Sequence, residues 1–168
     1  IVPDGVTKLV TMFGNDLLKK VFIHGDGRKK RETYPIEKLI AWNSDSESLI
    51  SAISVCPSLT DLNLASNATN EDIEQAVTKC PGLKRISISG LGCPATFRVT
   101  LANIEKSQIG PHLKSFTFDN FGGGENGDMW KFCRKCENLV ELILQVDEPL
   151  LRATDVMAIA THLKKLES

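Results

Sequence analysis

The sequence has few cysteines, few aromatic residues and no surplus of charge of either sign. Five cysteines among 168 residues is an odd and small number for a disulfide-stabilised scaffold, which favours reduced thiols and a cytoplasmic or nuclear location. Lysine and arginine number 20 against 21 acidic residues, so no field of the whole chain attracts nucleic acid or an anionic membrane. No apolar run approaches the roughly 18 to 20 residues that cross a bilayer, so no membrane partner is expected.

Patterns typical of catalysis are missing as well. His24, His112 and His162 fall in different segments, and none has a nucleophile and an orienting group nearby. The glycine run Gly122–Gly124 lacks the Gly-Lys-Ser/Thr ending of a phosphate loop and predicts a flexible connection instead. We therefore expect no enzyme, no catalytic residue, no cofactor and no small-molecule substrate.

What the sequence does contain is an internal repeat. The segments Cys56–Leu64, Cys80–Ile88 and Cys136–Leu144 share the template Cys-x-x-Leu-x-x-Leu/Ile-x-Leu/Ile. Two more segments, Gly110–Phe118 and Ala160–Leu166, fit it with one or two substitutions. The first leucine falls at positions 59, 83, 113, 139 and 163, so the units are 24 to 30 residues apart. This spacing is close to that of leucine-rich repeats.

The residues before each repeat have the spacing of one helix face. Apolar side chains recur there at i, i+3, i+4 and i+7. The sets are Leu49, Ala52, Ile53, Cys56; Ile73, Ala76, Val77, Cys80; Met129, Phe132, Cys133, Cys136; and Ala153, Val156, Met157, Ala160. Thr69 stands three residues before Asp72, as in a capping box. Each unit is therefore predicted to be a strand, a loop and a helix.

Such units bury their apolar faces only by stacking on one another. We therefore predict an α/β fold with one domain over residues 1–168, built from about six repeats. The expected form is a leucine-rich-repeat solenoid, a right-handed curved arc with parallel strands on the concave side and helices on the convex side.

The first units are less regular than the later ones. Val6–Phe13 has helical spacing, while Leu18–Ile23 and Ile36–Trp42 read as strands joined by a basic loop. The alternative is one long insertion between Leu18 and Leu59. Because the chain opens in a helix-like stretch and closes as a further strand begins at Leu163, it is expected to be part of a longer solenoid or assembly.

The repeat that opens on a cysteine resembles the cysteine-containing leucine-rich repeats of F-box proteins, in the ribonuclease-inhibitor-like superfamily. The resemblance covers Ser44–Leu91 and Asp128–Leu166 well. It implies an adaptor or substrate-recognition arc of a ubiquitin-ligase-type assembly. No F-box-like segment is found in this sequence, and the Asn expected after the strand is kept only in part, as Asn67.

Alternate residues of the predicted strands point away from the core, toward the concave side. A protein partner is expected to contact this side. The predicted partner-binding residues are Phe22, His24, Lys38, Ile40, Trp42, Asp61, Asn63, Arg85, Asp119, Glu141 and Ile143. Phe22, Ile40 and Trp42 form a predicted hot spot, and the alternative is that they are local core.

Two further patterns suggest specific chemistry. Cys133 and Cys136 have a spacing found in zinc and redox sites, yet both fall in apolar helix columns. With Cys56 and Cys80 they are predicted to be buried, unpaired thiols without a metal. A basic loop suits nuclear localisation or nucleic-acid binding, or is simply solvated. Its residues are Arg28, Lys29, Lys30 and Arg31.

These observations predict a non-catalytic protein–protein interaction module. One alternative is a structural subunit of a larger complex. The other is a nucleic-acid-associated repeat protein that uses the loop 28–31, which the balanced net charge disfavours.

Overall fold

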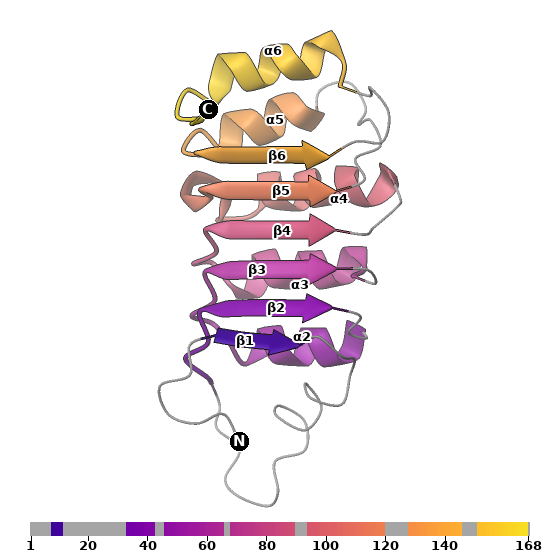
Figure 1. Ribbon diagram of the computed structural model, residues 1–168, viewed down its shortest axis with the longest axis vertical. Coiled ribbons are helices and arrows are strands. Elements are labelled where there is room, and N and C mark those ends of the chain that lie inside the picture. Colours follow the sequence, from indigo (N-terminus) through magenta and orange to yellow (C-terminus); the bar gives the residue numbers. More distant parts are fainter. Residues whose placement is uncertain are drawn as a thin grey trace, which may run out of the picture.

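The structure, a computed structural model, describes residues 8–11, 33–42, 46–65, 68–89, 94–119, 128–145 and 151–167, with the side chains of 8–11, 42, 65 and 94–96 left aside. These residues form an α/β fold around a six-stranded parallel sheet (Figure 1). The strands are β1 (Lys8–Thr11), β2 (Lys38–Trp42), β3 (Asp61–Ala65), β4 (Arg85–Ser89), β5 (Ser115–Asp119) and β6 (Glu141–Gln145). They lie side by side in chain order. The predicted α/β class and parallel strands are confirmed.

Helices follow the strands from β2 onward and lie behind the sheet in the view of Figure 1. Each helix contacts the next one along the chain. Their bounds are α2 (Ser46–Ser54), α3 (Asn70–Lys79), α4 (Pro94–Lys106), α5 (Asp128–Lys135) and α6 (Ala153–His162), with the short 3-10 helix η2 (Gly110–His112) before β5.

The core lies between the sheet and the helices, and the repeated apolar columns fill it. In β3, Leu62 and Leu64 are buried while Asp61 and Asn63 are partly exposed, because successive strand residues point to opposite faces. The predicted faces of α2, α3 and α5 are confirmed, since every apolar residue of those sets is buried. Each fully buried leucine contributes roughly 1.5 to 3 kcal/mol.

The chain enters each of the strands β3 to β6 through the same pair of backbone hydrogen bonds. The N–H groups of Lys84 and Arg85 both donate to the Thr60 carbonyl, at 2.8 and 3.0 Å. The residues at the start of β3, β5 and β6 repeat this arrangement with the unit before them. The repeated bonds align corresponding residues of neighbouring strands, so Asp61, Arg85 and the first residues of β5 and β6 form one line across the sheet.

The predicted helix over Val6–Phe13 is wrong. Lys8–Thr11 is strand β1, which pairs in parallel with β2 and places Lys8 opposite Lys38. A short apolar run fits helical and extended spacing equally well. Here the pairing with β2 at the edge of the sheet determines the extended conformation. Within the described part of the chain, the neighbours of β2 are β1 and β3. The predicted strand Leu18–Ile23 falls within residues 12–32. Residues 12–32 themselves lie outside the described residues.

The last unit is shifted by three residues from its predicted frame. The N–H of Leu163 caps α6 on the Ile159 carbonyl at 2.9 Å, the role that Cys80 has at the end of α3. The N–H of Glu167 then donates to Val140, the same contact that Val140 makes with the unit before it. Leu166, rather than Leu163, therefore occupies the position of the first repeat leucine. Leu163–Glu167 forms a turn and not the predicted strand.

The buried face of α6 also differs from the prediction. The predicted set Ala153, Val156, Met157 and Ala160 is exposed, with Val156 at 52% and Met157 at 62%. Asp155 and Ala158 are buried instead. The main contacts of α6 are with α5, and the face of α6 that carries Val156 and Met157 stays in solvent.

Candidate functional site: the open face of the sheet

The face of the sheet turned away from the helices is covered by no described helix, and we name it the open face (Figure 1). Strand register arranges its side chains in two rows. The first row is Lys38, Asp61, Arg85, Ser115 and Glu141. The second row is Ile40, Asn63, Ser87, Thr117 and Ile143. These rows bring together seven of the predicted partner-binding residues, and Asp119 lies beyond them, opposite Gln145.

The predicted hot spot of Phe22, Ile40 and Trp42 cannot be placed in the same way. Phe22, His24 and the basic loop 28–31 lie outside the described residues, as does the side chain of Trp42. Its remaining member, Ile40, is partly exposed at the centre of β2.

Asp61 is held in its ionised form by its neighbours in and beside the first row. The Arg85 Nη1 group lies 3.0 Å from Asp61 Oδ1, and the Thr60 hydroxyl donates to Asp61 Oδ2 at 2.8 Å. Burial acts to raise the pKa of Asp61, but these hydrogen bonds and the positive charges of Arg85 and Lys38 hold it below its usual value. The carboxylate therefore stays charged under ordinary conditions.

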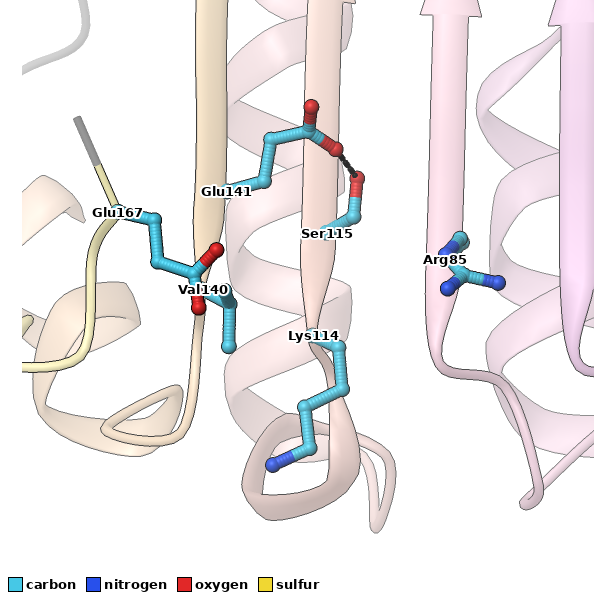
Figure 2. Close-up of a pocket in the computed structure, with 6 residues that line it drawn as sticks. All are labelled: Arg85, Lys114, Ser115, Val140, Glu141 and Glu167. Atoms are coloured by element: carbon cyan, nitrogen blue, oxygen red, sulfur yellow. Dashed lines mark hydrogen bonds between the residues drawn. The ribbon is translucent and has the colours of Figure 1, made fainter.

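Two adjoining hollows cross the open face near the amino-terminal ends of the strands. The larger, of about 610 Å³, is lined by Arg85, Lys114, Ser115, Val140, Glu141 and Glu167 (Figure 2). The smaller, of about 140 Å³, extends over β2 and β3 and shares Arg85 and Ser115 with it. Because the two hollows share these residues, we give them one name, the charged groove.

Within the larger hollow the charges are separated by sign. Arg85 and Lys114 come from β4 and from the residue before β5, whereas Glu141 and Glu167 come from β6 and from the turn after α6 (Figure 2). Ser115 lies between them, and its hydroxyl donates to Glu141 Oε2 at 2.6 Å. Sequence reasoning missed Lys114 and Glu167 as site residues, because neither lies inside a strand.

Asn63 occupies the centre of the second row on β3. Its Oδ1 atom is buried and accepts no hydrogen bond from the described part of the protein. A buried acceptor left in this state costs about 1 to 3 kcal/mol. The Asn63 residue also lines the smaller hollow.

The thiols lie on the opposite side of the sheet from this face, among the core residues. Cys56, Cys80, Cys133 and Cys136 are buried and free, as predicted. Burial raises their pKa, to about 11 for Cys80 and to about 12 for the other three. Neutral, enclosed thiols are poor nucleophiles and poor metal ligands. Among the described residues, no three His, Cys, Asp or Glu side chains gather as a metal site would require.

The two histidines that the structure describes, His112 and His162, lie in different units. His162 stacks edge-on against Trp130 with ring centroids 4.7 Å apart, and His112 is exposed in η2. No described helix is both long enough and apolar enough to pass through a membrane. The sequence matches no family model and no curated protein.

Proposed function

We propose that this protein is a leucine-rich-repeat solenoid that binds a protein partner on the open face and catalyses no reaction. One observation carries the proposal. Five successive strands, β2 to β6, present two aligned rows of side chains, polar or charged except for Ile40 and Ile143, on a face that no described helix covers. A surface of this kind is typical of the concave side of repeat proteins, which use it for binding.

Three further features support the solenoid architecture. The strands follow one another in chain order, the helices stack on one side, and the units recur every 24 to 30 residues. A parallel strand connected through a helix to its neighbour is almost always right-handed, so we propose a right-handed arc with the open face on its concave side. The resemblance to F-box repeats favours substrate recognition in a ubiquitin-ligase-type assembly, in the cytoplasm or nucleus.

The proposal is tested by blocking the centre of the open face. Ser87→Arg and Thr117→Arg place two large side chains in the second row, where wild-type residues are small and partly exposed. The matched control, Glu74→Arg, places the same side chain on the exposed face of α3. A partner retained from native extract by the wild type and the control, and lost by the blocked variant, would support binding through this face. Retention by all three proteins would remove the proposal.

A second candidate, a structural subunit of a larger complex, rests on the exposed apolar residues around α6. Val156 and Met157 are mostly exposed, and Trp130 of α5 is 43% exposed. Apolar patches of this sort often mark permanent interfaces. Light scattering separates the two functions, because a binding module should stay monomeric alone, whereas a subunit with a large uncovered interface should associate.

A further inference from the structure

The charged groove contains both signs of charge, and their arrangement restricts what it can bind. In the larger hollow the cations stand over β4 and β5, and the anions stand over and beyond β6, whereas in the smaller hollow Asp61 of β3 is paired with Arg85. A polyanion such as nucleic acid would gain from Arg85 and Lys114 but would be repelled by Glu141 and Glu167. A purely basic segment would meet the reverse problem. The groove is therefore complementary to a ligand that carries both charges in a fixed order.

The charged groups that line the larger hollow can still form contacts with a ligand. Among the described residues, Lys114 and Glu167 form no ion pair, and Glu141 uses one carboxylate oxygen to accept from Ser115. Arg85 is 65% exposed although it pairs with Asp61, so its guanidinium can donate further hydrogen bonds. Val140 is the only apolar side chain that lines the larger hollow. The charged side chains are therefore the groups that can distinguish one ligand from another in the larger hollow.

The spacing of the strands indicates how far apart the ligand's charges should be. Neighbouring strands are about 4.8 Å apart, so β5 and β6 are separated by one such step and β4 and β6 by about 10 Å. In an extended peptide, residues two apart point to the same side and are about 7 Å apart. This peptide spacing of about 7 Å lies between the β5–β6 separation of about 4.8 Å and the β4–β6 separation of about 10 Å. Long side chains such as Lys114 and Glu141 can cover the difference.

We infer that the charged groove binds an extended segment of the partner in which one acidic and one basic residue stand two positions apart. The acidic side chain lies over β4 and β5 beside Arg85 and Lys114, and the basic side chain lies over β6 beside Glu141. This inference rests on the proposed function, because it specifies the chemistry of the partner at one end of the open face.

The test selects random peptides, displayed on phage, on four folded proteins. These are the wild type, Lys114→Glu, Glu141→Lys, and the double variant with both changes, which has the wild-type net charge. Both side chains are exposed, so all four proteins should fold, and melting temperatures check this because Glu141→Lys removes the acceptor of the Ser115 hydroxyl. The wild type should select an acidic and a basic residue two apart, Lys114→Glu should select basic peptides, and Glu141→Lys should select acidic ones. The double variant should select the wild-type pair in reversed order.

A synthetic peptide of the wild-type selection should bind each single variant roughly tenfold more weakly, since each change replaces an attraction of about 0.5 to 1 kcal/mol by a similar repulsion. Selection of the same peptides by the wild type and the double variant would overturn the inference. Selection of uncharged peptides, or tighter binding of single-stranded RNA than of the peptide, would also overturn it.

The proteins blocked by Ser87→Arg and Thr117→Arg distinguish this failure from failure of the proposed function. If they lose the native partner while the double variant keeps it, the partner binds the open face but the groove does not select charge. If neither set loses the partner, the binding face itself is wrong.

Discussion

At the scale of single residues, Asn63 is the side chain whose surroundings suit it least. Its Oδ1 is buried with no donor among the described residues, and asparagine is disfavoured in strands. Asn63→Val should therefore raise the free energy of unfolding by about 1 kcal/mol. Because Asn63 lies on the proposed binding face, the same change should weaken partner binding. Denaturant unfolding and a binding titration measure the two effects.

Thr117→Val provides the control, since it introduces the same side chain two strands away without removing an unmet acceptor. It should change stability by less than about 0.5 kcal/mol. An Asn63→Val protein that is both less stable and unimpaired in binding would show that the side chain is structural.

The buried thiols make stability depend on alkaline pH. Their pKa rises from an ordinary 9.0 to about 11 for Cys80 and about 12 for Cys56, Cys133 and Cys136, because burial disfavours the thiolate. A group whose pKa is raised by folding stabilises fully below its unfolded pKa. Stability should therefore be constant up to about pH 9 and then fall as pH rises toward 12. Denaturant midpoints measured across this range check it.

A variant with alanine at these four positions gives the comparison. Its stability is lower at neutral pH, but its decline above pH 9 should be shallower than that of the wild type. Equal slopes would mean that other groups, such as lysines, cause the alkaline loss.

At the scale of elements, the start of α3 depends on one buried carboxylate. Asp72 accepts hydrogen bonds from the backbone and hydroxyl of Thr69, which completes a capping box, and from the hydroxyl of Ser46 at the start of α2. Asp72→Ala should lower the free energy of unfolding by about 2 kcal/mol, because it removes the side-chain half of the capping box and the bond between the two helices. Glu71→Ala, one residue earlier and exposed, should cost less than about 0.5 kcal/mol. Thermal melting compares them.

The orientation of α6 is tested by a pair of substitutions. Met157→Lys should change stability by less than about 0.5 kcal/mol, because Met157 is mostly in solvent. Ala158→Glu should cost about 3 kcal/mol or more, because Ala158 is fully buried and a carboxylate there has no counterion. The helix face that the sequence predicted gives the opposite order, so the two melting temperatures decide between them.

Elements were predictable where independent signals agreed. For α3, the apolar spacing, the Thr69–Asp72 cap and the following Cys80 template all indicated the same helix, and the structure confirms it. At β1 only a short apolar spacing was present, and its partner strand, thirty residues away, could not be inferred from it. In the last unit, Leu163 and Leu166 both fit the template, and only the backbone bond from Glu167 to Val140 fixes the frame.

The residues of the candidate site that lie inside strands were predictable from the sequence, and those outside the strands were not. Alternation along the strands identified Asp61, Arg85 and Glu141 as open-face residues, because that pattern depends on one strand at a time. Lys114 and Glu167 escaped detection because their place in the charged groove depends on how neighbouring units align.

At the scale of the whole molecule, aromatic rings join the middle units. The ring centroid of Phe116 in β5 lies 5.1 Å from that of Phe132 in α5 and 6.3 Å from that of Phe118. The ring of Phe118 in turn packs edge-on against Phe97 of α4. Phe116→Ala should cost about 3 to 5 kcal/mol. Because each unit contacts only its neighbours, this change should also uncouple the two halves. Hydrogen exchange should then show β6 and α5 opening while β3 and α3 stay protected, whereas Phe116→Leu should preserve a single transition.

The order of the strands has a mechanical consequence. β1 and α6 stand at opposite ends of the stack in Figure 1, so a force that separates those ends acts across the strands rather than along them. Because this force acts along the hydrogen bonds between strands, the bonds of one strand pair break before those of the next, and not all together. Each unit that detaches releases 24 to 30 residues, which is roughly 80 to 105 Å of extended chain. Stretched between two anchors, this protein would lengthen in low-force steps and act as a compliant spring.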